Sequence, residues 1–396
     1  MIDWITARVP VRAASQLKTG EITSCDPDGV LDWAIAKRIN TRGSHATTVS
    51  VRRFGDSVLE FAGSPAKYLQ GHNAFGSDDL VGLGTAMITR ACRRLGIELL
   101  ESEIDDIRAG RYNLLRVDVN YSFATRSRAN ALAWIEQAAM VGSVKRRGRA
   151  RLQGSSSAMW GEKSRHWKLK AYSKGAEITA PKHKLPMSFP SRDQMNAWCD
   201  DKLRIEVELK ARYLRKLGLD QASSWSSGTA LGLFQEHLGR LQLGGKLVVN
   251  PAGVESLPYR LRPTHSLWFQ GANLRQLMSD ATYYRHRTEL MRRGINIGVP
   301  PRQEATTIPL SQYIVSPCID VPAWAVGAGL YFDPGKDGKE LDEGWSSLSV
   351  RQGYGVTSTL VKNEPAPAHQ SAVERTVDSQ TARAEYELDN ALEHAA

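Results

Sequence analysis

The sequence predicts an α+β fold in which helices cover one face of an antiparallel sheet, followed by a smaller helical domain and an acidic, disordered tail. Side chains that alternate strictly between apolar and polar predict the sheet, and they lie at residues 115–122, 166–174 and 203–210. Such alternation is typical of strands with one buried face. Helices are predicted from apolar residues at helical spacing, at 80–95, 126–140, 229–241, 267–279 and 281–293.

Local signals justify further elements and the domain limits. β-branched residues around a Gly55-Asp56 turn predict a hairpin over residues 47–61. Ser77-Asp78-Asp79 supplies an N-cap for the helix that begins at residue 80. The predicted divisions are a first domain at 1–219, a helical domain at 220–332 and a tail at 333–396. The tail is rich in Gly, Ser, Pro, Ala and acidic residues, a composition that favours disorder.

Length and composition exclude several classes of protein. The 396 residues are 41% apolar, which argues against disorder throughout the chain. The longest apolar stretch, 321–332, contains a proline and is shorter than the roughly 20 residues of a membrane-spanning helix. The opening residues MIDWITARVP do not have the pattern of a signal peptide. The four cysteines lie far apart, which favours a reducing cytoplasm over a zinc pair or a disulfide framework.

The charge of the chain is unevenly distributed. The net charge is +10, but residues 333–396 carry 6 basic and 12 acidic residues, against 46 basic and 30 acidic residues in 1–332. A basic globular body suggests a polyanionic partner, most often nucleic acid. A basic enzyme without any nucleic-acid role is the equal alternative.

The polar face of the predicted sheet is the candidate metal site. Asp118 lies on one alternating strand, and Glu206 and Glu208 lie on another. Carboxylates from two strands can hold a divalent cation through oxygen ligands and leave positions for water and a phosphate. The alternative is the ordinary polar face of an antiparallel sheet, with ion pairs across its strands.

A tyrosine on the same face is the candidate nucleophile. Tyr172 lies two residues from both Lys170 and Lys174, so the three side chains are expected on one side of a strand. Adjacent ammonium groups would lower the pKa of the phenol from its ordinary value of about 10. The resulting phenolate could attack a phosphodiester. The polar-face alternative applies here too.

Two further features have both a functional and a structural interpretation. His72 is a candidate metal ligand or phosphate contact, although a lone histidine is more often a structural hydrogen-bond donor. A basic run predicts an exposed loop that could hold a DNA backbone, or could simply be solvated. Its charged residues are Lys145, Arg146, Arg147, Arg149 and Arg151.

A collinear series of motifs lies between residues 1 and 219. It comprises MIDWITARVP at 1–10, SPAKYLQGHNAFGSDDL at 64–80, RVD at 116–118, SRH at 164–166, AYSK at 171–174 with Glu177, and RIE at 204–206. This series resembles the replication initiators encoded by gene II of filamentous bacteriophages, the phage replication protein II/X family. Residues 220–332 resemble that family more loosely.

The resemblance implies an activity. Initiators of this kind nick one strand of replicative-form DNA at the phage origin, remain joined to the 5′ phosphate through a tyrosine, and leave a 3′-OH for the host polymerase. They later rejoin the displaced strand into a circle. By this resemblance, 1–219 is the nicking and joining domain, Tyr172 is the nucleophile and Lys174 stabilises charge beside it. The cofactor would be Mg²⁺ or Mn²⁺. The partners would be origin DNA, a host helicase and the polymerase, in the bacterial cytoplasm and away from any membrane.

Site roles carried over in this way remain candidates. Asp118, Glu206, Glu208 and His72 are the candidate metal ligands. DNA contacts are expected from Lys170, Arg116 and Arg204 together with the basic run. The family resembles histidine-dependent nickases with a ferredoxin-like sheet, yet this chain has no His-hydrophobic-His triplet.

The nucleophile motif holds a single tyrosine, so termination would need Tyr213 or a second protomer on the DNA. Two rival functions remain. One is a non-catalytic origin-binding protein or repressor on the same scaffold. The other is a plasmid or conjugative nickase.

Overall fold

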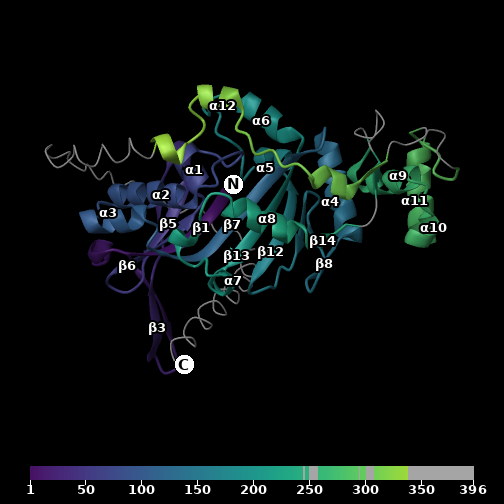
Figure 1. Ribbon diagram of the computed structural model, residues 1–396. Coiled ribbons are helices and arrows are strands. Elements are labelled where there is room, and N and C mark those ends of the chain that lie inside the picture. The colour runs from purple at the N-terminus through teal and green to yellow at the C-terminus, as the bar shows by residue number, and fades with distance from the viewer. Residues whose placement is uncertain (244–245, 249–256, 294, 300–306, 338–396) are drawn as a thin grey trace, which may run out of the picture. The chain divides into compact units, whose positions relative to one another are not determined.

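A nine-stranded antiparallel sheet organises the computed structural model, which describes residues 1–243, 246–248, 257–293, 295–299 and 307–337 (Figure 1). From one edge to the other its strands are β10 (Arg151–Gln153), β11 (Ser157–Trp160), β12 (Trp167–Ser173), β13 (Lys202–Lys210), β7 (Asn113–Ala124), β1 (Ile2–Pro10), β6 (Val58–Gly63), β5 (Thr48–Arg53) and β4 (Ile39–Arg42). The expectation of helices and strands built on a large antiparallel sheet is confirmed. The relation to histidine-dependent nickases stays a prediction.

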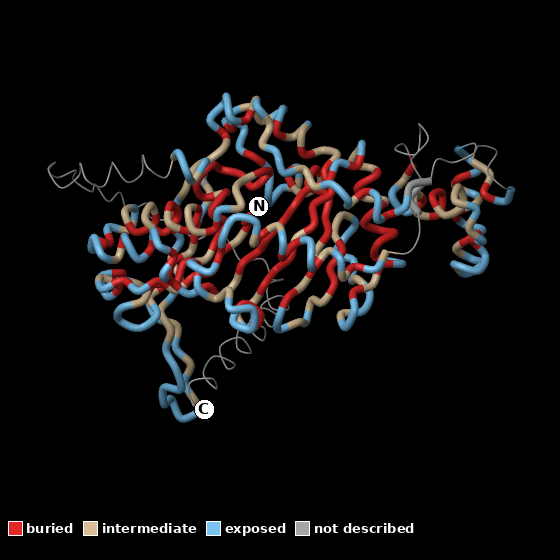
Figure 2. The backbone as a smooth tube through the Cα atoms, viewed as in Figure 1, coloured by how far each residue is buried: buried red, intermediate tan, exposed pale blue. Residues whose placement is uncertain are grey.

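Shorter strands form three small sheets beside the large one. They are β2 (Glu21–Cys25) with β3 (Leu31–Ala36), β14 (Leu241–Gln242) with β8 (Ser143–Val144) and β9 (Gly148–Arg149), and β15 (Lys246–Val248) with β16 (Thr307–Pro309). The β2–β3 hairpin is largely exposed (Figure 2), and the sequence analysis did not predict it.

Helices connect these strands. The α-helices are α1 (Pro65–Gln70), α2 (Leu80–Leu95), α3 (Glu101–Arg108), α4 (Arg128–Val141), α5 (Lys174–Thr179), α6 (Arg192–Asp200), α7 (Ala211–Leu217), α8 (Thr229–Leu238), α9 (Arg262–Phe269), α10 (Leu274–Leu277), α11 (Asp280–Met291) and α12 (Ala323–Gly327). The 3-10 helices are η1 (Arg12–Gln16), η2 (Ser44–Ala46), η3 (Ala222–Ser224), η5 (Tyr259–Leu261) and η6 (Leu310–Ile314).

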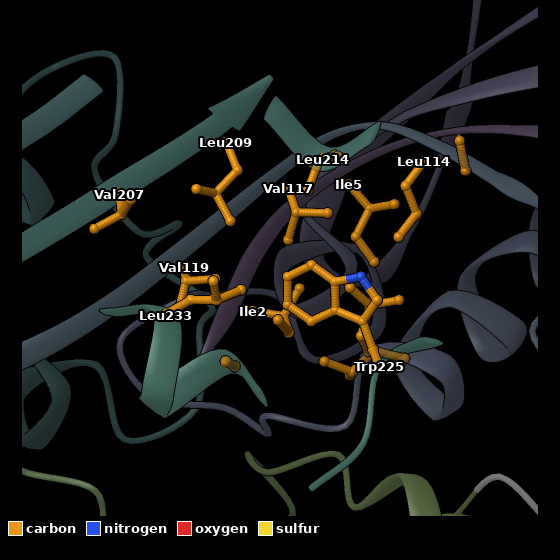
Figure 3. Packing of buried hydrophobic residues seen from close by; sticks show 14 of the residues in the cluster. Ile2, Ile5, Leu114, Val117, Val119, Val207, Leu209, Leu214, Trp225 and Leu233 are labelled. Carbon is orange, nitrogen blue, oxygen red and sulfur yellow. The ribbon is translucent and has the colours of Figure 1, made fainter. Parts of the chain in front are cut away.

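The apolar face of the sheet forms the main core with α2, α3, α4, α7 and α8. Figure 3 shows side chains of β1, β7 and β13 converging with Leu214 of α7, Leu233 of α8 and Trp225. Ile5 and Val117 are fully buried there. Burying a side chain of this size stabilises the fold by roughly 1.5–3 kcal/mol. The core therefore fixes which face of each strand points away from it.

The predicted strands and caps are confirmed. Strands β7, β12 and β13 cover the three alternating segments, and β5 and β6 form the hairpin predicted over residues 47–61. Helix α2 begins at Leu80, and the Asp79 carboxylate accepts the backbone N–H of Gly82 at 2.8 Å. This bond satisfies one of the free N–H groups at the helix start.

Two predicted segments differ from the structure. The helix expected over 267–279 is divided into α9 and α10, because Gly271 between them has φ of +77°. The basic run expected as a loop contributes to β8, β9 and β10, since antiparallel pairing satisfies its backbone while the charged side chains stay in water.

Residues after the sheet contribute to three different cores. Helix α8 belongs to the main core, whereas α9, α10 and α11 surround a small core of their own. Helix α12 joins α5 and α6 in another small cluster. Residues 1–346 form one compact unit, so the division into 1–219 and 220–332 stays a prediction. Most of the predicted disordered tail, 338–396, lies outside the described residues.

Candidate active site

The polar face of β12, β13 and β7 brings several predicted site residues together. Tyr172 lies directly opposite Arg204, and Lys170 lies opposite Glu206. Glu206 in turn lies opposite Asn120 on β7. Opposed side chains in antiparallel strands have Cβ atoms about 4.5–5.5 Å apart. The prediction that the tyrosine, a lysine and the acids share one face of the sheet is therefore confirmed.

Tyr172 is nearly buried on this face, with 6% of its surface exposed. The ammonium of Lys170 lies 4.8 Å from the ring centroid, over the face of the ring. Burial raises the pKa of Tyr172 well above its ordinary value of about 10, and the positive charge of Arg204 offsets only part of that rise. The expectation that neighbouring lysines lower this pKa is wrong for this structure, because removing the phenolate from water outweighs the attraction of the cations.

Lys174 differs from its predicted position. Strand β12 ends at Ser173, whose side chain caps α5, and Lys174 is the first residue of that helix. Only 2% of Lys174 is exposed. Its ammonium donates to the Asn73 side-chain oxygen at 2.8 Å and to Glu177. Burial lowers the pKa of Lys174. Lys174 therefore ties α5 to the loop that contains Asn73, rather than projecting from β12 beside Tyr172.

Arg204 holds the same loop against the sheet. Its guanidinium donates to the backbone carbonyls of Asn73 and Ala74, and to the Ser122 hydroxyl at 3.0 Å. Only 1% of the residue is exposed. The predicted DNA contact of Arg204 does not fit this burial, because a guanidinium enclosed by two carbonyls and the tyrosine opposite is closed to an outside phosphate.

The loop after α1 explains the longest motif of the chain. Gly71 ends α1 with φ of +88°, and a Cβ atom there would lie 2.5 Å from Nδ1 of His45. Glycine alone fits that position without a clash. The Gln70 amide then donates to the carbonyl of Phe75 at 2.8 Å, and its oxygen accepts the backbone N–H of Phe332 at 2.9 Å. The motif thus builds a closed loop and places Asn73 against the sheet.

His72 is a structural residue of this loop. Its Nε2 donates to the carbonyl of Leu330 at 2.7 Å, while Nδ1 accepts the backbone N–H of Ala74 at 3.1 Å. Burial lowers the pKa of His72 to about 3, so the ring is neutral. The metal-ligand prediction for His72 is wrong for this structure, because both ring nitrogens already have partners.

Asp118 and Glu208 are neutralised by side chains of the same face. Arg116 donates to both oxygens of Asp118, at 2.8 and 2.6 Å. The same guanidinium lies 2.7 Å from Glu208, and the Lys168 ammonium lies 2.8 Å from it. The ring of Trp4 is 5.3 Å from the guanidinium carbon of Arg116. Arg116 is therefore engaged by two carboxylates and an aromatic ring, which does not fit its predicted DNA contact.

The predicted metal ligands do not assemble into one site. Among the residues that the structure describes, no three His, Cys, Asp or Glu side chains form a group that could hold a metal ion. Asp118 and Glu208 do not fit a cation, because Arg116 and Lys168 already supply their positive charge. Within the same described ranges, Glu206 is the predicted carboxylate that no ion pair engages.

Two polar residues near Glu206 were given no role by the sequence. Asp3 lies at a β-bulge of β1, and its Oδ1 accepts the Asn73 amide at 2.8 Å. Asn120 is fully buried, and both polar atoms of its side chain have no hydrogen-bond partner within the described part of the chain. Asn120 and Arg204 line a cavity of about 210 Å³. Alternation placed Asn120 on the polar face, but no signal marks the bulge at Asp3.

The basic run lies at the β10 edge of the same sheet. Arg151 pairs in register with Met159 of β11, which pairs with Lys170. These three side chains therefore continue one cross-strand row toward the candidate site. Lys145, Arg146, Arg149 and Arg151 are exposed, whereas Arg147 lies 4.9 Å from the ring of Trp167. Arg146, Arg147, Arg149, Arg151 and Lys163 line a surface hollow of about 390 Å³.

Comparison with known proteins identifies the family. The family model for the N-terminal region of the gene II replication-associated protein matches residues 1–228, and the model for its C-terminal region matches 249–329. The replication-associated protein of this kind from Enterobacteria phage I2-2 is 33% identical over 333 residues, 82% of this chain and 96% of that protein. The proteins of the same name from Enterobacteria phages M13 and fd are 27% and 26% identical over 175 residues, 41% of this chain and 42% of each. The resemblance seen in the motifs is confirmed, and the chain belongs to the family of gene II replication-associated proteins.

Proposed function

We propose that this chain initiates rolling-circle replication of a filamentous phage. It cuts one strand of the double-stranded phage DNA at the origin through Tyr172 and later rejoins the displaced strand into a circle. Family membership supports the replication role. One structural observation supports the chemistry: Tyr172 faces Arg204 across two strands, with Glu206 diagonally adjacent and a cavity beside Arg204.

The proposed reaction is a transesterification that needs no energy source. The Tyr172 oxygen attacks the scissile phosphorus, the P–O3′ bond breaks, and the phenolic proton leaves while the 3′ oxygen gains one. The product is a 5′-phosphotyrosine ester and a free 3′-OH. Rejoining is the reverse step, in which an incoming 3′-OH displaces the tyrosine. The ester keeps the free energy of the broken phosphodiester, so closure of the circle needs no ATP.

Positive groups around Tyr172 have distinct proposed roles. The guanidinium of Arg204, opposite the ring, stabilises the phenolate and the charge that develops on the phosphate. Lys170 contacts the ring face and lies on the open side toward β11. Lys174 is a positioning residue, because its ammonium is held by Asn73 and Glu177. A bound Mg²⁺ or Mn²⁺ would polarise the scissile phosphate.

DNA is proposed to reach the site from the β10 edge. Exposed cations of the basic run lie at that edge, and the row from Arg151 through Met159 to Lys170 leads toward Tyr172. Each phosphate neutralised by such a cation releases counterions, which supplies affinity without sequence preference. Binding must also open the covered end of the site, since Tyr172 is nearly buried in the free protein.

A second tyrosine from the same protomer does not support termination. Tyr213 belongs to the main core on the apolar face, and its ring lies 5.4 Å from that of His237. Tyr172 lies on the polar face, so the sheet separates the two phenols. Closure of the circle is therefore proposed to use Tyr172 again or the Tyr172 of a second protomer.

The proposed setting is the cytoplasm of a bacterial host. There a host helicase would unwind the nicked duplex and a host polymerase would extend the 3′-OH. In the described ranges, no helix combines the length and apolar character needed to cross a bilayer.

The test compares nicking of supercoiled plasmids with and without the phage origin, in Mg²⁺. The parent protein is expected to relax only the origin plasmid, and Tyr172→Phe is expected to bind the origin without relaxing it. Tyr213→Phe is the matched control and should nick like the parent. Origin binding without nicking by the parent would instead support a non-catalytic origin-binding protein. Nicking that does not depend on the phage origin would support a plasmid or conjugative nickase.

A further inference from the structure

We propose that Asp3, Asn120 and Glu206 together form a divalent-cation site on the polar face of β1, β7 and β13. The inference deepens the proposed function and rests on it, because the ion would lie beside Tyr172. It replaces the metal ligands predicted from the sequence, except for Glu206.

The three side chains come from adjacent strands of the sheet. Glu206 of β13 lies directly opposite Asn120 of β7. Strand β1 is the other neighbour of β7, and its register shifts between Ile2 and Trp4. Asp3 is the extra residue at that shift. A β-bulge bends the strand and re-aims a side chain, which brings the Asp3 carboxylate onto the polar face next to Trp4.

Asn120 supplies the independent sign of a ligand. It is fully buried, and neither its Oδ1 nor its Nδ2 has a partner among the residues that the structure describes. Leaving a buried amide unpaired costs about 1–3 kcal/mol for each unsatisfied group. Asn120 also lines the 210 Å³ cavity, which has room for an ion with several waters. A cation on Oδ1 and a water or phosphate oxygen on Nδ2 would satisfy both atoms.

The charges of this group are unbalanced, in contrast to those of the neighbouring pair. Burial and then the Asp3 carboxylate raise the pKa of Glu206, which indicates two nearby acids that repel each other. Asp118 and Glu208 instead have Arg116 and Lys168 as partners. Two carboxylates and an amide oxygen are hard ligands of the kind that Mg²⁺, Mn²⁺ and Ca²⁺ prefer.

The position of the site suits the proposed chemistry. Glu206 is two residues from Arg204, and Arg204 lies directly opposite Tyr172. Diagonal neighbours across antiparallel strands are about 7–8 Å apart at Cα. A phosphate that binds the ion would therefore reach the tyrosine oxygen. Asn73 links the groups further, since it donates to Asp3 and accepts from Lys174.

Manganese binding tests the proposal without DNA. Mn²⁺ is titrated into the full-length protein, and the electron paramagnetic resonance signal of free Mn²⁺ is followed. Asp3→Asn, Glu206→Gln and Asn120→Leu are each expected to weaken binding at least about tenfold. Asp118→Asn and Glu208→Gln are the matched controls and should bind Mn²⁺ as the parent does. Weakening by these controls alone, or an unchanged affinity in all three site variants, would overturn the site.

Two further measurements separate the failure modes. Asn120→Asp adds a carboxylate and should bind Mn²⁺ more tightly than the parent, a gain that misfolding could not produce; no gain would count against the site. Tyr172→Phe should bind Mn²⁺ normally while failing to nick. If the parent binds Mn²⁺ at these residues but never nicks origin DNA, the cation site stands and the proposed function fails. If it nicks while the site variants bind Mn²⁺ normally, the function stands and the site fails.

Discussion

Tyr172 of β12 and Arg204 of β13 lie directly opposite each other, and each is almost completely buried. The guanidinium also donates to the carbonyls of Asn73 and Ala74. One side chain therefore fixes the loop of the longest motif and sets the electrostatic environment of the candidate nucleophile. Stability and chemistry are coupled at Arg204.

Removal of Arg204 is expected to destabilise the protein. Arg204→Ala leaves two buried carbonyls and the Ser122 hydroxyl without their donor, which should lower the free energy of unfolding by about 3 kcal/mol. Urea denaturation measures this change. Arg149→Ala, at an exposed position, should change the same quantity by less than about 0.5 kcal/mol. A loss of similar size in both variants would contradict the role of Arg204 as a buried clamp.

Glu177 is expected to make the protein sensitive to acid. Burial raises the pKa of Glu177, but Lys174 and Lys67 outweigh burial and bring it from 4.5 to about 2. A carboxyl with a depressed pKa stabilises the fold above pH 4.5, and that stabilisation is lost as the pH falls toward 2. Glu177→Gln should therefore be less stable than the parent at pH 7, by about 2–3 kcal/mol, and lose less stability between pH 5 and 2.

Denaturant titrations at several pH values measure the effect of Glu177→Gln. Glu162→Gln is the control, because Glu162 forms an exposed ion pair with Arg151 at 3.1 Å. Such pairs contribute little to stability. Parallel pH profiles for the parent and Glu177→Gln would refute the prediction.

His72 is expected to affect stability but not cation binding. Its pKa is lowered to about 3 by burial, so the unfolded chain binds more protons than the folded one between pH 6.5 and 3. The stability of the parent should fall as the pH drops through this range, and His72→Gln should flatten part of that fall. Mn²⁺ affinity measured at pH 7 should be unchanged in folded His72→Gln. A tenfold loss of affinity would restore His72 as a ligand.

The basic run is expected to govern affinity for DNA regardless of sequence. Replacing Arg146, Arg149 and Arg151 together by Ala should lower the slope of log affinity against log salt by up to about three. Fluorescence anisotropy with a labelled duplex at several NaCl concentrations measures that slope. A triple Ala variant of the exposed Lys18, Lys216 and Lys336 controls for net charge. Equal slopes in the two variants would show that charge alone, and not the β10 edge, decides affinity.

Alternation made the central part of the site predictable. Lys170, Tyr172, Glu206 and Asp118 were placed on one face because a strand turns successive side chains to opposite sides. Local sequence contains that information, and the core of the sheet enforces it. The Asp79 cap of α2 was predictable for the same reason, since the cap and its helix are adjacent in the chain.

What the sequence left open depends on contacts between distant residues. The bulge that re-aims Asp3 exists only when β1 pairs with β7, more than 100 residues away. The burial that raises the pKa of Tyr172 comes from packing, which outweighed the lysines seen nearby in the chain. Arg116 was expected to contact DNA, yet its partner Glu208 lies on another strand. Pairing and burial of this kind cannot be read from one strand alone.

The most direct measurement is to map the covalent link to DNA. The parent, Tyr172→Phe and Tyr213→Phe are incubated with Mg²⁺ and supercoiled origin DNA, denatured in detergent, and digested with nuclease and protease. Mass spectrometry then identifies the peptide that carries the nucleotide. We expect the nucleotide on Tyr172 in the parent and in Tyr213→Phe, and no adduct in Tyr172→Phe. An adduct on another residue, or an adduct that persists in Tyr172→Phe, would contradict the assignment of Tyr172 as the nucleophile.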